Sequence, residues 1–427
     1  MKDENKLYWV WLSLRLGTAS KEFAKLAGTM TDPYDIYRLS EEEIEQLKLG
    51  ERAKQNLCDK SLTDAYAIIK YCKSEKVDII GYTDKRYPAR LRTIEDPPVL
   101  LYCKGKMPDM DERLCIGVVG TRKMSEYGMQ TAYKISYELS AAGACVVSGM
   151  ALGIDAVSAC GAIEGGGATV AVLGCGIAVT YPKAHATLSR AISSCGAVIT
   201  EYPPYERPFP ANFPKRNRII SGLCQGVLIV EGAKGSGALI TATKAIGQGR
   251  QLFALPGKVN ESNSDGPNEL IRNGANVALC ADDIINYYDF LYHDTLNFKA
   301  YSRAKKSSDM REKVLEKYKV EEVIETIGSK PVTETRADLP KNTVPKSEHK
   351  DEEKKDRGSD VTVSDQSALN ALDEDTRKIY EMLPDGIFTA DDMVTKGVAV
   401  HHVMTALTML EISGLITSLP GGSFKKI

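Results

Sequence analysis

Short runs of consecutive apolar residues, each followed by a longer stretch of helical periodicity, fill the middle of the chain. Continuous apolar strands separated by helices are typical of a parallel sheet that is covered on both faces. We therefore predict an α/β, Rossmann-like, doubly wound domain with a mostly parallel sheet over residues 114–290. Its expected strands are Cys115–Val119, Ala144–Val147, Thr169–Leu173, Ala197–Thr200, Val227–Val230, Gln251–Leu255 and Asn276–Leu279.

The residues before this domain show two other patterns. Residues 1–75 read as short helices, and Ser40 followed by three glutamates is typical of a helix N-cap with acids in the first turn. Residues 76–113 form a proline-rich extension that leads into the sheet and carries two expected strands, at Ile79–Ile80 and Val99–Tyr102. We expect a small helical domain followed by this extension.

The residues after the domain divide into a linker and a small module. Residues 291–366 are highly charged and poor in apolar side chains, which is typical of a linker. Residues 367–427 predict a winged helix, with helices at Leu372–Leu383, Phe388–Thr395 and Val398–Ser413 before a hairpin closed by Pro420-Gly421-Gly422. Its expected recognition helix contains no Lys or Arg, so we expect a modulatory or protein-contact module rather than a transcription regulator.

Composition narrows the class of protein. A chain of 427 residues is expected to hold several domains. The net charge of −2 gives no global reason to expect a nucleic acid, so such a partner must be argued from local charge. The ten cysteines form no CxxC pair, which argues against a metal site and a disulfide framework. We find neither a signal peptide nor a membrane span, and we expect a cytoplasmic protein that has no membrane partner.

Several of the expected strands lead into turns of small residues. In an open α/β sheet such turns collect along the carboxyl edge, where backbone N–H groups at helix N-termini favour anions. The residues concerned are Gly120, Thr121, Arg122, Ser148, Gly149, Gly174, Gly176, Ser236 and Gly237. Gly174 and Gly176 fit a simple tight turn equally well. Asp155 fits either a helix cap or a ligand group, and Glu231 either a structural or an orienting role.

The segment Asn212–Arg218 is the most concentrated chemistry in the chain. It places the cations Lys215, Arg216 and Arg218 beside two amides and one aromatic ring, and leads directly into an apolar helix start. Cations suit phosphates, amides such as Asn217 suit base edges, and a ring such as Phe213 suits base stacking. An ordinary solvated face does not explain this interleaving of polar and aromatic residues.

Features needed for several catalytic classes are missing from the sequence. There is no GxxxxGK[ST] loop and no GxGxxG fingerprint. His185 is the only histidine in the sheet domain, and no nucleophile–base set accompanies it. We therefore expect a binding protein that is not an enzyme and needs no cofactor. The alternative is a Rossmann-type nucleotide-processing enzyme resembling the phosphoribohydrolases, with Glu231 beside Gly235-Ser236-Gly237.

The chain resembles the DNA-processing protein A (DprA/Smf) family over nearly its whole length. The resemblance rests most on Val119–Arg122, Ser148–Asp155, Ala171–Gly176 and the block Asn212–Gly257. It implies a single-stranded DNA-binding recombination mediator that protects incoming strands and loads RecA during natural transformation. It also implies a homodimer formed through the Rossmann-like domain, a sterile-alpha-motif-like N-terminal domain and a C-terminal winged helix. Single-strand-binding protein is a further candidate partner.

The resemblance also assigns roles to individual residues. It implies that Arg122 and the segment Lys215–Arg218 contact DNA phosphates and that Phe213 offers a stacking surface. Ser236 and Thr241 match the family's Ser-Gly-x-x-x-Thr turn near the path of the strand. With the glycine turns, these residues form the expected DNA site.

Overall fold

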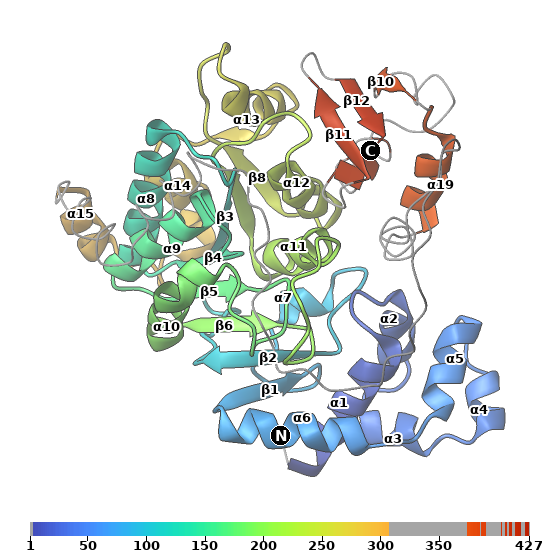
Figure 1. Cartoon of the computed structure of the whole chain (residues 1–427). Coiled ribbons are helices and arrows are strands. Elements are labelled where there is room, and N and C mark those ends of the chain that lie inside the picture. The colour runs from blue at the N-terminus through green and yellow to red at the C-terminus, as the bar shows by residue number, and fades with distance from the viewer. Residues whose placement is uncertain are drawn as a thin grey trace, which may run out of the picture. The chain divides into compact units, whose positions relative to one another are not determined.

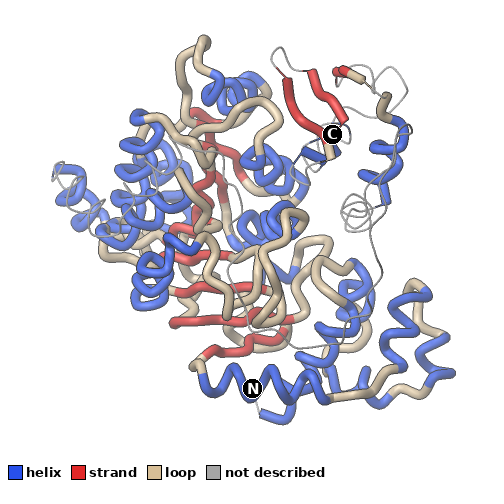
Figure 2. Tube along the Cα trace, in the orientation of Figure 1, coloured by secondary structure: helices blue, strands red, loops and turns tan. Residues whose placement is uncertain are grey.

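The computed structural model describes residues 3–306 and, in the C-terminal part, residues 374–384, 386–389, 415–419, 423–426 and single positions between 403 and 411. The chain divides into two compact units, Met1–Glu325 and Thr326–Ile427. The first unit holds a helical segment and a large sheet domain (Figures 1 and 2). The second holds a small three-stranded sheet with a helix before it.

Residues 3–74 are helical, as the sequence predicts. Ser40 accepts a hydrogen bond from the Glu43 N–H, and the Glu43 carboxylate accepts one from the Ser40 N–H, which completes the expected N-cap. Trp9 and Trp11 are fully buried and form the centre of this segment. Its helices are α1 (Asp3–Leu16), α2 (Lys21–Ala27), α3 (Pro33–Arg38), α4 (Glu41–Glu45), α5 (Glu51–Cys58) and α6 (Thr63–Ser74).

A nine-stranded sheet dominates the first unit, with the order β1-β2-β6-β5-β4-β3-β7-β8-β9. All pairs from β6 to β9 are parallel, whereas β1 and β2 join one edge in antiparallel fashion. The seven strands expected for the domain are present with ends within two residues of the prediction, and the extension supplies the remaining two. The strands are β1 (Val77–Gly81), β2 (Leu100–Gly105), β3 (Cys115–Val119), β4 (Cys145–Ser148), β5 (Thr169–Val172), β6 (Ala197–Thr200), β7 (Gly226–Ile229), β8 (Gln251–Ala254) and β9 (Asn276–Val277).

Helices cover both faces of the sheet, as the continuous apolar strands require (Figure 1). Successive residues of β3 point to opposite cores: Ile116 packs on one side and Cys115 on the other. One face is covered by α8 (Glu126–Ala141), α9 (Ile154–Glu164), α10 (Ala186–Cys195) and α14 (Ala281–Tyr292). The other is covered by α7 (Ala89–Arg92), α11 (Asn212–Leu223) and α12 (Gly237–Gly247), with α13 (Ser262–Arg272) following β8.

The strand order reverses at β3, which lies between β4 and β7. Ligands in open α/β sheets bind at such a point, outside the carboxyl ends of the strands. The chain runs outward from β3 to β6 and returns through α11 to β7. Because β7 is parallel to β6, this return must end at the amino edge, so α11 begins at the carboxyl edge. Its N-terminal residues therefore lie beside the turns that follow β3, β4 and β5.

The structure differs from the expected linker at its start. Helix α15 (Phe298–Lys306) packs against α8 and buries Tyr301 and Ala304. The Tyr301 hydroxyl also donates a 2.5 Å hydrogen bond to Asp282. A charged segment thus forms a helix because a few apolar side chains share one face. Residues 307–366 of the expected linker lie outside the described residues.

The C-terminal unit contains the expected hairpin, β11 (Ile416–Leu419) and β12 (Ser423–Lys426), and the helix α19 (Glu374–Met382). The predicted helix Phe388–Thr395 is wrong at its first two residues, Phe388 and Thr389, which belong to a strand. Strand β10 (Ile387–Thr389) pairs there with β12, and Phe388 stacks on Phe424 at 6.0 Å. A β-branched and aromatic triplet favours a strand once a distant partner strand is available.

Candidate nucleic-acid interface

The turns at the carboxyl edge are tied to one another by backbone and side-chain hydrogen bonds. The Thr121 N–H donates to the Glu231 carbonyl (2.8 Å), which joins the turns after β3 and β7 at the reversal point. The Ile154 N–H donates to the Thr121 carbonyl (3.2 Å). The buried Asp155 carboxylate accepts from Gly149 N–H (3.0 Å) and Ala151 N–H (3.4 Å). Asp155 therefore closes the turn after β4, a role that differs from the two that its sequence position suggested.

Three glycines of these turns are required by the protein's own packing. A Cβ on Gly149 would lie 2.4 Å from Nη2 of Arg216, and one on Gly174 would lie 2.8 Å from the Phe213 ring. A Cβ on Gly176 would meet the Pro203 carbonyl oxygen at 2.2 Å. These glycines give α11 and the loop before it room to approach the edge.

A small pocket opens between these turns and the start of α11. It brings together the exposed Arg122, the turns at Gly149 and Gly174, and the half-buried ring of Phe213, all of which the sequence predicts as site residues. Its other lining residues were not predicted: Met150, Ala151, Leu152, Leu173, Cys175, Tyr181 and Pro182. The pocket confirms that these distant segments meet at one point.

Phe213 lies at the centre of a group of cations and rings. The guanidinium carbon of Arg122 is 5.6 Å from the ring centroid, and that of Arg216 is 5.9 Å away. The Tyr181 ring, which is 38% exposed, lies 5.4 Å from the same ring. Sequence reasoning missed Tyr181. The available signal was an aromatic residue two positions before Lys183, after the Gly174–Gly176 turn, which resembles the pattern around Phe213.

Arg216 lies beneath the pocket and not on its surface. Its Nη1 donates to the carbonyls of Gly149 (2.8 Å) and Val172, and its Nε donates to Oδ1 of Asn217 (3.1 Å). Burial lowers the pKa of this guanidinium, and the nearby Asp155 opposes that shift. Burial likewise raises the pKa of Asp155, against the effect of Arg216. Arg216 thus holds two turns together and places positive charge behind them.

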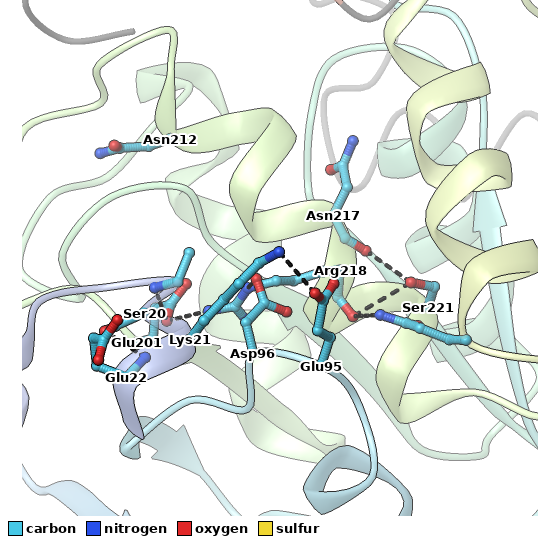
Figure 3. Close-up of polar contacts among 12 residues, drawn as sticks. Ser20, Lys21, Glu22, Glu95, Asp96, Glu201, Asn212, Asn217, Arg218 and Ser221 are labelled. Carbon is cyan, nitrogen blue, oxygen red and sulfur yellow. Dashed lines mark hydrogen bonds and ion pairs between the residues drawn. The ribbon is translucent and has the colours of Figure 1, made fainter. Parts of the chain in front are cut away.

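Arg218 is 1% exposed and is bound by two carboxylates (Figure 3). Its Nη2 donates to Glu201 (2.6 Å) and its Nε pairs with Asp96 (3.0 Å). Burial alone would lower the pKa of Arg218, but Glu201 and Asp96 outweigh it and the pKa is raised. The Glu201 carboxylate also accepts from the Ala19 N–H (3.2 Å), so the cluster joins α11 to the helical segment. The family resemblance implies that Arg218 contacts a DNA phosphate. In the structure its guanidinium is instead bound by carboxylates from two distant segments.

Four of the remaining predicted residues belong to or contact α12, and the others lie elsewhere along the carboxyl edge. Asn217 donates from Nδ2 to the Gly237 carbonyl (3.4 Å), which ties α11 to α12. Ser236 is the N-cap residue of α12 by backbone conformation, and Thr241 is buried inside that helix. Ser148 donates to the Val118 carbonyl (2.9 Å) within the sheet. Lys215 is half-buried and Gly120 packs against Ile154.

Glu231 and His185 have structural partners. The Glu231 carboxylate is buried and accepts from the Ser125 N–H (2.9 Å) and the Ser125 hydroxyl, at the N-cap of α8. His185 Nδ1 lies 3.0 Å from the Met150 carbonyl, and burial lowers its pKa. Among the described residues, no group of His, Cys, Asp or Glu is arranged to hold a metal ion. Within the same residues, every helix is too short or too polar to cross a bilayer.

Comparison with known proteins identifies the family. The family model for DNA recombination-mediator protein A matches residues 78–289, and that for the DprA winged helix domain matches residues 364–422. The chain is 38% identical to DNA processing protein DprA of Bacillus subtilis over 212 residues, covering 50% of this chain and 71% of that protein. It is 34% identical to DprA of Streptococcus pneumoniae over 283 residues, covering 60% of this chain and 98% of that protein.

The chain belongs to the DprA/Smf family. The X-ray structure of DNA processing protein A from Streptococcus pneumoniae matches it with a TM-score of 0.56 and 32% sequence identity, over 66% of this chain and 97% of that one. The DprA match over 78–289 includes all of β1 except Val77, together with β2 and the whole parallel sheet. The C-terminal match agrees with the predicted winged helix.

Proposed function

We propose that this DprA family member is a recombination mediator that binds single-stranded DNA at the carboxyl edge of its sheet. The observation that carries the proposal is the pocket in which Arg122, Phe213 and the turns at Gly149 and Gly174 meet. A ring flanked by two guanidinium groups, next to backbone turns at helix starts, suits bases and phosphates together. Membership of the DprA family supports the same conclusion.

The roles within the site differ from residue to residue. Arg122 is exposed and Lys215 half-buried, so we assign the phosphate contacts to these two residues. Phe213 supplies the stacking surface. Arg216 acts as a positioning residue, because it is 4% exposed and bonds the turns from behind. Ser236 and Gly237 remain candidate contacts near the path of the strand, whereas the buried Thr241 supports α12 from within.

We further propose that the protein loads RecA onto incoming strands in natural transformation, protects those strands, and displaces single-strand-binding protein. Support comes from the DprA resemblance and from the family model, which describes a recombination mediator. The winged helix is proposed to modulate this activity. Its Lys426 donates to the Leu383 carbonyl (2.9 Å) and lies 4.8 Å from the Tyr380 ring, which suits a structural role.

A homodimer through the sheet domain is also proposed, and its best candidate surface is the sheet edge at β9, which pairs with no strand beyond β8 among the described residues. An edge strand offers unpaired backbone groups to another chain. Val277 on β9 is 44% exposed and Leu279 just after it is 63% exposed. Tyr287, on the neighbouring helix α14, is 51% exposed and lies against Phe253 of β8. Apolar side chains along an unpaired edge favour a second copy of the chain as the occupant.

Leu279→Glu is expected to shift the protein from dimer to monomer in sedimentation velocity at micromolar concentration. A buried, unpaired carboxylate opposes association strongly. Ile246→Glu is the matched control, because Ile246 is 61% exposed on α12 and outside this edge. It should leave the mass unchanged. A dimer that persists in Leu279→Glu would place the interface elsewhere.

The binding proposal is tested by titrating fluorescent single-stranded and duplex oligonucleotides of equal length with the full chain. Tighter binding of the single strand is expected, because a flat ring reaches unstacked bases only. The alternative, a phosphoribohydrolase-like enzyme, predicts release of free base from nucleoside monophosphates and loss of that activity in Glu231→Gln. Equal or tighter duplex binding, or such release, would contradict the proposal.

A further inference from the structure

The loop between β6 and α11 holds two large rings in solvent. Tyr205 is 69% exposed and Phe209 is 51% exposed. The loop is nevertheless firmly bonded: the N–H groups of Gly176 and Ala178 donate to the carbonyls of Glu206 and Pro204, each at 2.9 Å. The rings are therefore presented by a fixed backbone, which lowers the entropy lost when a ligand stacks on them.

These rings continue a line of aromatic side chains that begins in the pocket. The Tyr181 and Phe213 rings lie 5.4 Å apart at the pocket, and the N–H of Asn212, the first residue of α11, donates to the Phe209 carbonyl (3.0 Å). Phe209 precedes Phe213 by four residues, a stretch that spans at most about 14 Å. At the other end, the Tyr205 ring lies 5.0 Å from Tyr71 of α6. The line thus runs from the pocket to the N-terminal helices.

Charge along this line favours a polyanion. Arg207, between the two rings, and Lys183, beside Tyr181, are exposed. Glu206 is the one acid in the loop 202–211 and is half-buried, while the exposed Glu75 lies near Tyr71 at the far end of the line. Exposed rings interleaved with cations are the arrangement that binds single strands through stacked bases and phosphates.

We propose that Tyr205 and Phe209 form a second stacking subsite, which takes the bases of a DNA strand that leaves the Phe213 pocket toward α6. This inference rests on the proposed function, because it extends the same strand. The subsite matters only for strands longer than the pocket itself holds. On this proposal the N-terminal helical segment lies next to the DNA strand but contacts none of its bases.

The test compares the double variant Tyr205→Ala/Phe209→Ala with the wild type on oligothymidylates of about 3 and about 20 nucleotides, because about 3 nucleotides are too short to extend past the pocket. Wild-type affinity should rise with length. The variant should lose roughly ten-fold or more in affinity for the long strand, and stay within about two-fold of the wild type on the short one. Tyr205→Phe/Phe209→Tyr, which keeps both rings, should restore long-strand binding. Tyr66→Ala is the matched control, since Tyr66 is 60% exposed on α6.

The possible outcomes distinguish a failure of the second stacking subsite from a failure of the proposed single-stranded DNA binding. Wild-type affinity of the variant at both lengths would overturn the subsite and leave the proposed function intact. An equal loss at both lengths would also overturn it, because the rings would then serve the pocket. Failure of the wild type to bind either strand would remove both proposals. Circular dichroism and thermal melting of each variant establish that the fold is kept.

Discussion

Arg218→Met is expected to lower the free energy of unfolding by about 3–5 kcal/mol, because it leaves two carboxylates without their cation. The side chains of Glu201 and Asp96 are only 4% and 18% exposed. Neither can recover full hydration in place. The loss should appear as a lower midpoint in chemical denaturation with an unchanged slope.

The double variant Arg218→Met/Glu201→Gln should recover part of this loss, since the amide removes one uncompensated charge. Lys21→Met provides the exposed comparison. Lys21 pairs with Glu95 in the same region (2.7 Å, Figure 3), but both side chains are more than half exposed, so its replacement should change stability by less than about 1 kcal/mol. An Arg218→Met protein as stable as the wild type would show that the cluster contributes little to the stability of the fold.

Phe213→Ala is expected to weaken single-stranded DNA binding by roughly 5- to 150-fold, the range for loss of one stacked base. The ring contributes twice: it faces the pocket, and it lies against the guanidinium groups of Arg122 and Arg216. Fluorescence anisotropy with a short oligonucleotide measures the change directly.

Phe213→Tyr separates stacking from packing, because it keeps the ring against Gly174 and between the two arginines. It should bind DNA within a few-fold of the wild type. Both variants should melt cooperatively, which establishes that any loss of affinity is local. Wild-type affinity in Phe213→Ala would remove the ring from the interface.

The sheet and its carboxyl edge could be predicted from the sequence because their signals are local. Each buried parallel strand is a continuous apolar run, and each turn after it is marked by glycine. The family motifs also placed Arg122, Gly149, Gly174 and Phe213 in one site, and the pocket brings those four together. The local hydrophobic pattern and the rules of parallel sheets were therefore sufficient to predict the sheet and its carboxyl edge.

What the sequence could not show depends on contacts between distant segments. The sequence predicts Arg216 and Arg218 as surface cations. In the structure Arg216 is bound by the carbonyls of Gly149 and Val172. Arg218 is bound by the carboxylates of Glu201 and Asp96. The sequence also predicts that a ligand approaches the backbone at the glycine turns. In the structure, side chains of α11 fill the space beside Gly149 and Gly174. Phe388 is likewise predicted in a helix, but it belongs to a strand because β10 pairs with β12, which is distant in the sequence. Charge and composition alone carry no information on such partners.

The salt dependence of single-stranded DNA binding in Arg122→Ala tests the central claim most directly. Arg122 is the exposed cation at the mouth of the pocket, so its loss should weaken binding of every sequence. It should also reduce the slope of log K against log salt by about 0.7, the value for one phosphate contact on a single strand. Lys258→Ala, an exposed lysine paired with Glu261, is the control and should leave the slope unchanged. An Arg122→Ala protein with wild-type affinity and slope would contradict a DNA site at this edge.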